Sequence, residues 1–167
     1  ATPLGILKEG GGSLPSYMDL FLGNTGGCLG ETCALALILG GVYLIVRRVI
    51  SPVIPVTYLA TAALFSALFG RDPLFDLLSG GLLLGAFFMA TDYTTSPLYF
   101  WGRVVFAFGC GLMTMVIREF GSLPEGVSYS IILMNILTPL IERYIKPRAF
   151  GSQRAPKGKK GGARDEA

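Results

Sequence analysis

A glycine-rich stretch with polar side chains precedes the first long apolar run of this 167-residue chain. Residues 23–32 combine several glycines with Asn24, Glu31 and Thr32. Glycines allow tight turns and a close approach of the backbone to a ligand, and Thr32 is placed to cap the helix that follows. Free backbone amides at such a helix start favour an anion or a phosphate. A glycine-rich turn that only packs helices fits the same spacing, so both interpretations stay open.

Two more polar residues interrupt apolar runs. Asp92 directly follows one run and precedes several hydroxyl side chains, and Asn135 lies midway through the last run, four residues before Pro139. Polar groups at membrane depth are costly and usually functional, which makes Asp92 and Asn135 candidates for an ion pathway. Alternatively, Asp92 ends a helix at an interface, and Asn135 forms a hydrogen bond to another helix.

Residue composition excludes several kinds of site. The chain has no histidine, the commonest proton shuttle and metal ligand. Its cysteines, Cys28, Cys33 and Cys110, do not form a CxxC-type motif. We therefore expect no metal site, and most hydrolase and zinc chemistry is disfavoured.

Five apolar stretches predict an all-α, polytopic membrane protein. Only 15% of the residues are charged and the mean hydropathy is +0.58, whereas a soluble domain is about a quarter charged. Each stretch is close to the about 20 residues that a helix needs to cross a bilayer. They cover residues 33–50, 53–70, 75–91, 99–117 and 126–145.

Local patterns refine this outline. Tyr17–Leu22 fits a short interfacial helix, and the small residues at 79–81 either pack helices closely or break the third stretch. We expect Arg118 and Glu119, near the end of the fourth stretch, to extend toward the outer interface.

The basic residues flanking the stretches predict the orientation. One group of flanks holds Arg47, Arg48, Arg103 and Arg143 together with the basic C-terminal residues, and the positive-inside rule places it in the cytoplasm. We therefore expect three regions: an outward-facing segment at 1–32, a transmembrane domain at 33–148 and a disordered cytoplasmic tail at 149–167. The basic tail has the charge to bind anionic lipid.

Several stretches in order resemble the RnfD/NqrB family of flavin-carrying membrane subunits, and the RnfD branch most closely. The resemblance extends from Ala1 to Gly151 and includes these landmarks: Ala1-Thr2-Pro3-Leu4, residues 23–32, the run from Gly85 to Asp92, Arg118-Glu119-Phe120 and Glu125-Gly126-Val127.

The resemblance implies a covalently bound cofactor. In that family a Ser-Gly-Ala-Thr motif receives FMN on its threonine through a phosphodiester, attached by a flavin transferase outside the membrane. The chain opens with Ala-Thr, which implies FMN on Thr2, with Asn24, Glu31 and Thr32 as further cofactor-binding candidates. Family subunits consist of two related membrane halves. This chain resembles the C-terminal half, and riboflavin is a further cofactor expected in the full-length protein.

The function implied is that of an electron-transfer component in an Rnf-type, ion-translocating ferredoxin:NAD oxidoreductase that moves Na+ or H+. The implied partners are the other subunits of the Rnf complex (A, B, C, E and G), the flavin transferase and membrane lipid, with no nucleic acid. The implied location is the cytoplasmic (inner) membrane of a bacterium or archaeon. A non-redox solute channel or secondary transporter is the alternative, because broken helices suit it equally well.

The two acids next to apolar runs allow a more specific hypothesis. Glu31 and Asp92 could point into one cavity beside a flavin, where a carboxylate could bind a cation as an electron arrives. The alternative places the two acids at opposite interfaces, each at a helix end.

Overall fold

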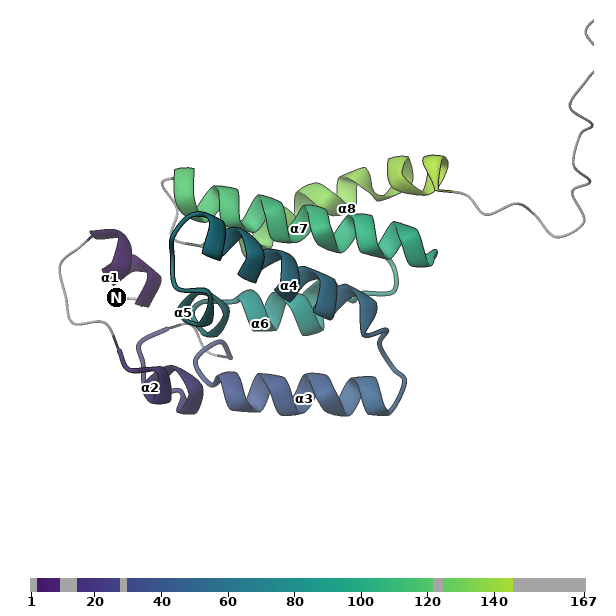
Figure 1. The fold of residues 1–167 in the computed structure, drawn as a ribbon. Helices are drawn as coiled ribbons and strands as arrows, with labels where there is room; N and C mark the ends of the chain where they lie inside the picture. Colours follow the sequence, from purple (N-terminus) through teal and green to yellow (C-terminus); the bar gives the residue numbers. More distant parts are fainter. Residues whose placement is uncertain (1–2, 10–14, 28–29, 122–124, 146–167) are drawn as a thin grey trace, which may run out of the picture.

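The computed structural model describes residues 3–9, 15–27, 30–121 and 125–145, and these contain helices and loops but no strand. The expected all-α class is therefore confirmed. The elements, in chain order, are α1 (Pro3–Glu9), α2 (Tyr17–Leu22), α3 (Ala34–Val46), α4 (Val53–Leu68), α5 (Pro73–Leu78), α6 (Leu82–Leu84), the π-helix η1 (Gly85–Met89), α7 (Phe100–Phe120) and α8 (Val127–Tyr144) (Figure 1).

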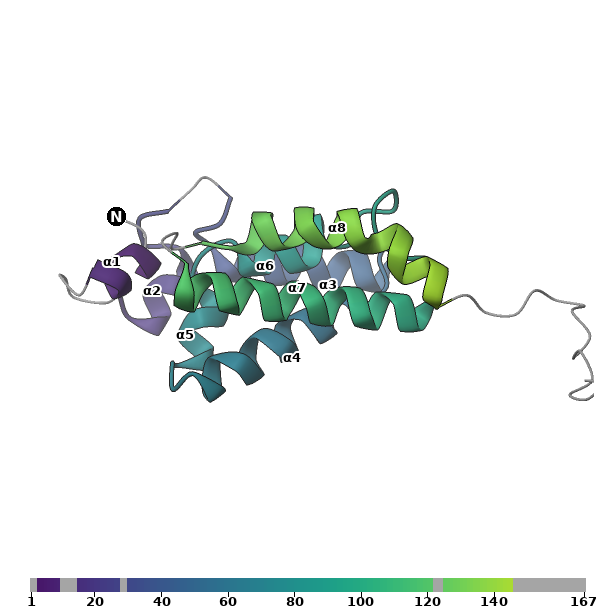
Figure 2. The ribbon, with the colours of Figure 1, turned by 90° about the horizontal axis from the view of Figure 1, so that it is seen from above.

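The long helices lie side by side and successive segments run in alternating directions, so their connections fall at two ends (Figures 1 and 2). One end carries α1, α2 and α5, together with the end of α7 and the start of α8; we call it the α1 end. The other carries the α3–α4 connection, the start of α7 and the end of α8; we call it the α3–α4 end.

At the centre of the molecule, α7 packs against both α4 and α8. A Cβ on Gly111 would lie only 2.7 Å from Thr61 Cβ, so glycine allows α7 to approach α4 closely. The fully buried Tyr58 hydroxyl lies 2.7 Å from Thr114 Oγ1 and 3.3 Å from Ser130 Oγ. These contacts join α4, α7 and α8 through one set of hydroxyl groups.

The third apolar stretch is broken rather than continuous. Helix α5 ends at Leu78, Gly80 adopts a left-handed φ of +68°, and the chain restarts as the short α6. It then widens into η1, where Ala90 N–H donates to Gly85 O at 2.7 Å, five residues back. Of the two roles considered for the small residues at 79–81, the break is confirmed.

Helix lengths support a membrane-spanning role only in part. Within the described ranges, one helix, Phe100–Phe120, is long and apolar enough to cross a bilayer. Helices α3 and α4 are apolar but shorter, so five spans are not confirmed. The predicted helix at Tyr17–Leu22 is confirmed, and Ser16 caps it through a reciprocal pair of bonds with Asp19.

Candidate functional site at the α1 end

A small hollow beside the start of α1 is lined by two of the four predicted cofactor residues, Glu31 and Thr32. Thr2 lies outside the described residues, but Pro3, the next residue, lines this hollow together with Glu31, Thr32 and Glu125. Its volume of about 20 Å³ is enough for one water molecule. The hollow therefore has room for a small polar group or a water molecule beside the backbone of α1.

Asn24 and Thr32, two of the predicted cofactor residues, both lie in the connection between α2 and α3. Asn24 is exposed and its N–H donates to Asp19 O at 2.9 Å, which closes the turn after α2. Thr32 does not cap α3, because the N-cap is Cys33, which makes no side-chain capping bond. The expectation that Thr32 caps the helix is wrong, since α3 begins one residue later than the apolar pattern indicates.

Glu31 is partly buried and lines the hollow with a second acid, Glu125, which was not among the predicted cofactor residues. Burial raises the pKa of Glu31 above its ordinary value, the charge of Glu125 raises it further, and the Arg118 charge opposes both. Glu125 Oε1 is buried and has no hydrogen-bond partner among the described residues. The site thus holds two acids whose charges repel each other, with one cation beside them.

That cation, Arg118, lies inside the protein. The residue is only 2% exposed, and its guanidinium donates to the backbone carbonyls of Asp76 (2.8 Å) and Ser79 (3.3 Å). The end of a helix leaves carbonyls without intrahelical partners, and Arg118 supplies donors to the end of α5. The expectation that Arg118 reaches the interface is therefore wrong, because the break after α5 creates acceptors inside the protein.

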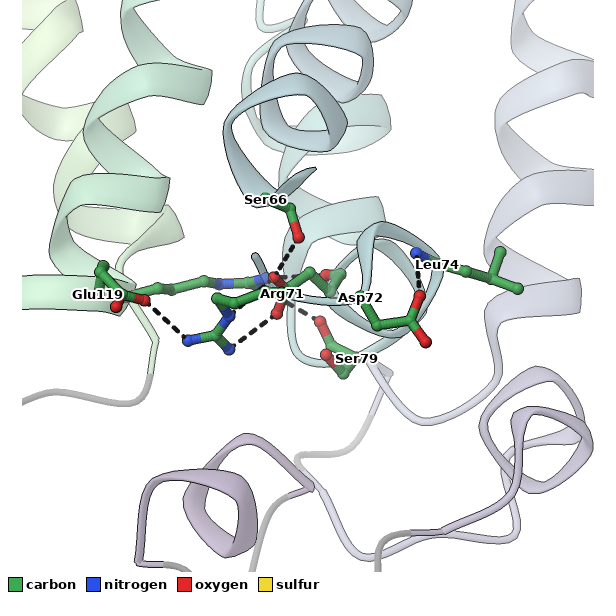
Figure 3. A network of polar contacts seen from close by, with 8 residues as sticks. Ser66, Arg71, Asp72, Leu74, Ser79 and Glu119 are labelled. Atoms are coloured by element: carbon green, nitrogen blue, oxygen red, sulfur yellow. Dashed lines mark hydrogen bonds and ion pairs between the residues drawn. The ribbon is translucent and has the colours of Figure 1, made fainter. Parts of the chain in front are cut away.

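A second charged network (Figure 3) includes Asp76, the residue whose backbone carbonyl accepts a hydrogen bond from Arg118. The buried Asp76 carboxylate accepts hydrogen bonds from Ser66 Oγ (2.6 Å) and from Arg71 (2.9 Å). Arg71 also contacts Glu119 at 3.4 Å. The network ties α4, α5 and α7 together where their ends meet, which fixes the framework around the hollow.

Helix α1 lies over this framework and borders two larger cavities. Lys8 Nζ donates to the Gly121 carbonyl, which joins α1 to the residue after α7. A cavity of about 200 Å³ lies between Leu7 and Arg118, and one of about 750 Å³ lies between Leu7 and Phe75. The larger volume is within the usual range of about 300–1,000 Å³ for small-molecule sites.

The two candidate ion-pathway residues lie near each other at the α3–α4 end. Asp92 is exposed and accepts hydrogen bonds from Thr94 and Thr95, and the Thr94 bond is the main reason why the pKa of Asp92 is lowered. Both threonines line a cavity of about 350 Å³ together with Asn135.

Asn135 itself has unused oxygen acceptors. Its Oδ1 is buried without a partner among the described residues, so the expected hydrogen bond to another helix is not formed by this atom. Pro139 has no N–H to donate to the Asn135 carbonyl, which therefore lacks its usual partner in α8.

Glu31 and Asp92 do not share a cavity. Glu31 lies beside Pro3 and Glu125 at the α1 end, whereas Asp92 precedes Tyr93, whose hydroxyl donates to the Val49 carbonyl at the α3–α4 end. The shared-cavity hypothesis is therefore wrong, and the two acids lie at opposite helix ends.

Comparison with known proteins adds the family. Residues 1–151 match the model of the NQR2, RnfD, RnfE family. The chain is 56% identical over 154 residues to the D subunit of the Na(+)-translocating ferredoxin:NAD(+) oxidoreductase complex of Acetobacterium woodii, a match that covers 90% of this chain and 48% of that protein.

Two other relatives have related names. The D subunit of the proton-translocating ferredoxin:NAD(+) oxidoreductase complex of Clostridium ljungdahlii is 45% identical, over 92% of this chain and 51% of that protein. The D subunit of the ion-translocating oxidoreductase complex of Stutzerimonas stutzeri is 49% identical, over 81% of this chain and 40% of that protein. The chain spans about half the length of these curated relatives. With a family match over residues 1–151, the chain belongs to the NQR2, RnfD, RnfE family.

Proposed function

We propose that this chain acts within the RnfD-type component of an ion-translocating ferredoxin:NAD+ oxidoreductase and relays electrons through FMN bound covalently to Thr2. The observation that carries this proposal is the 56% identity, over 90% of the chain, to a protein named as that component. The relatives' names include both Na+ and H+ translocation, so the proposal covers either ion. The other subunits of the complex and a flavin transferase are the proposed partners.

The residues of the α1 end fit a group attached at Thr2. Pro3, which follows Thr2 in the chain, lines the hollow with Glu31 and Thr32, and this polar lining supports the proposal. The hollow is too small for a flavin ring, whereas the 750 Å³ cavity next to α1 has walls that include Tyr17 and Phe75. These aromatic rings are suited to hold a planar ring system. FMN bound there would supply electron transfer, and the protein would set its position and potential.

The proposed topology has five membrane crossings, with α1 outside and the C-terminus in the cytoplasm. Large apolar side chains are exposed along the helices, for example Leu39, Val46, Leu64 and Ile136, as expected for contact with lipid. Arg47 and Arg48 lie at the α3–α4 end and Arg143 lies near the end of α8, so this end faces the cytoplasm in the proposal. In this topology, residues 1–32 form the flavin-attachment segment, 33–148 the membrane domain and 149–167 a cytoplasmic tail.

The proposed ion route includes the cavity of about 350 Å³ at the α3–α4 end, which faces the cytoplasm in this topology. The route includes Asn135, whose buried Oδ1 has no partner among the described residues, and Asp92, whose carboxylate is bonded to two threonines that line the cavity. Oxygen atoms of these kinds are ligands that a hard cation such as Na+ accepts. In the full-length protein, riboflavin is proposed as a second, noncovalent cofactor.

A Thr2→Ala substitution in the full-length protein tests the flavin proposal. We expect the flavin fluorescence that remains with the denatured band on a gel to disappear. The matched control is Thr57→Ala in α4, far from the attachment segment, which should keep the fluorescence. Covalent flavin in the Thr2→Ala variant, or its absence from the parent protein, would refute the assignment and favour the non-redox channel or transporter.

A second experiment tests the topology in intact cells. Single cysteines are introduced at Ser13 or Ser152 after the three native cysteines have been replaced. An impermeant thiol reagent should label Ser13→Cys but not Ser152→Cys, and the opposite pattern would reverse the proposed orientation.

A further inference from the structure

Helix α3 ends in an arginine at a position where helices usually carry glycine. The Val49 N–H donates to the Leu44 carbonyl and the Arg48 N–H donates to the Ile45 carbonyl, both at 2.9 Å. These two bonds form the Schellman motif, in which a residue in the left-handed conformation follows the helix. Arg48 is that residue, with a φ of +55°, and no other non-glycine residue in the described ranges has a positive φ. Any residue with a Cβ is less favourable here than glycine, so the backbone of the helix end does not explain the arginine.

Arg48 and its neighbour Arg47 have no anionic partner in the described part of the chain. Both residues are exposed, and no described acid forms an ion pair with either. The described acids at the α3–α4 end have other donors. Asp92 accepts hydrogen bonds from two threonines of its own loop, and Glu142 accepts one from the Leu98 N–H. Two adjacent positive charges are therefore available to a ligand at the end of α3.

Exposed apolar side chains flank these two charges. Tyr43, Val46 and Arg47 are spaced three and four residues apart, so they lie on one face of α3, and Val46 is 73% exposed. Tyr43 and Val49 are exposed as well. The Tyr93 hydroxyl donates to the Val49 carbonyl and brings a further exposed ring to the same place. A ligand that suits this surface combines an anionic group with apolar chains.

We propose that the end of α3 binds an anionic phospholipid, with Arg47 and Arg48 on its phosphate group and the flanking apolar side chains against its acyl chains. A guanidinium suits phosphate because it donates several hydrogen bonds from a fixed, planar group. The tyrosines fit this place too, since Tyr and Trp are enriched where membrane proteins cross the lipid–water interface. The proposal rests on one part of the proposed function, namely that the α3–α4 end lies at a membrane surface (Figure 1). It does not depend on the flavin.

A purely structural role for the arginines leads to the opposite expectation for stability. Positive charges at the end of a helix interact favourably with the helix dipole, so their removal would lower the Tm. In our proposal Arg48 serves the lipid at the expense of the backbone conformation. Arg48→Gly should therefore raise the Tm of the full-length protein in an uncharged detergent without added lipid, while it weakens lipid binding. A lower Tm together with unchanged lipid binding would overturn the proposal.

Native mass spectrometry of the full-length protein in the same detergent measures lipid binding. The protein is titrated with phosphatidylglycerol or with phosphatidylcholine that has the same acyl chains. A basic residue beside anionic lipid contributes about 1 kcal/mol, or about fivefold in affinity. Arg47→Gln and Arg48→Gly should each weaken the binding of one phosphatidylglycerol molecule by about that factor and leave phosphatidylcholine binding unchanged. Arg48→Lys, which keeps the charge, should retain most of the affinity.

The matched control is Arg143→Gln, which removes an exposed arginine from α8 at the same end of the molecule. This variant should keep the phosphatidylglycerol molecule that Arg47→Gln loses. Equal losses in the two variants would show a general attraction between basic residues and anionic lipid, and would overturn the site. Glycerol phosphate, which has no acyl chains, should not displace the lipid at equal concentration. Displacement would identify a site for a soluble anion and refute the lipid assignment.

Two further readings separate this proposal from its alternatives. If the arginine variants keep the lipid but lose another subunit from the purified complex, the end of α3 is a protein contact and the lipid site is overturned. The variants should keep in-gel flavin fluorescence. A parent protein without covalent flavin would refute the proposed function and leave the lipid result standing, because lipid binding in detergent depends neither on the flavin nor on the orientation in the membrane.

Discussion

Arg118 Nη1 donates a 2.8 Å hydrogen bond to the backbone carbonyl of Asp76, and this bond joins the last turn of α7 to the short helix α5. The side-chain carboxylate of Asp76 forms an ion pair with Arg71. Two arginines thus hold Asp76, one through its backbone and one through its carboxylate. The arrangement keeps α5 in place although this helix has only six residues.

Arg118→Met should destabilise the protein strongly. The substitution leaves the Asp76 and Ser79 carbonyls without their charged donor, and we expect the free energy of unfolding to fall by about 3 kcal/mol. Denaturant unfolding of the purified protein in detergent measures this change. Arg143→Met, at an exposed position near the end of α8, is the control and should change the value by less than about 0.5 kcal/mol. Equal losses in the two variants would contradict the structural role of Arg118.

Gly80→Ala should cost more stability than Gly70→Ala. Both glycines have a left-handed φ, +68° and +71°, so each substitution should cost about 1–2 kcal/mol in backbone conformation. At Gly80 the new Cβ would also lie 2.7 Å from Leu4 Cδ1, whereas at Gly70 nothing lies within 4 Å. Thermal unfolding should therefore show a larger drop in Tm for Gly80→Ala. A larger drop for Gly70→Ala would show that α1 does not pack against Gly80.

The pH dependence of stability should carry the signature of Glu31. The pKa of this residue is raised in the folded protein, chiefly by burial, so the folded state binds the proton more tightly than the unfolded state. Stability should then fall as the pH rises from the ordinary glutamate pKa through the raised one. In Glu31→Gln this decrease should be smaller. The Tm of the variant minus that of the wild type should therefore increase with pH. Parallel Tm profiles for the two proteins would contradict the raised pKa.

Tyr58→Phe should weaken the contact among α4, α7 and α8. Removal of the buried hydroxyl leaves Thr114 and Ser130 with one partner fewer, and we expect a loss of about 1–2 kcal/mol in the free energy of unfolding. Tyr129→Phe, at an exposed position on α8, is the matched control and should be close to neutral. If the two variants unfold alike, the hydroxyl contacts do not contribute to stability.

The long helices could be predicted from the sequence because apolar runs determine them. The predicted stretch at 99–117 corresponds to Phe100–Phe120, and the stretch at 126–145 corresponds to Val127–Tyr144. The break at Gly80 could be given only as an alternative, since small residues serve both close packing and left-handed turns.

The candidate site was predictable only in part. Glu31 was identified from its place before an apolar run, but its neighbour Glu125 comes from a segment far along the chain. The burial of Arg118 could not be predicted either, because its acceptors exist only where α5 ends early. Both relationships depend on the tertiary structure and leave no local pattern in the sequence.

The π-helix at Gly85–Met89 determines the directions in which the side chains between it and α7 point. Each residue in an α-helix turns the chain by about 100°, so the additional residue of a π-turn rotates the following side chains by that angle relative to an unbroken α-helix. Within η1 this rotation turns Phe87 inward and Phe88 outward. Deleting one residue of η1 would return the segment to α-helical winding and rotate Thr91 and Asp92 to a different side of the molecule. The direction in which the acid at the α3–α4 end points is thus controlled by the winding of the backbone seven to three residues earlier.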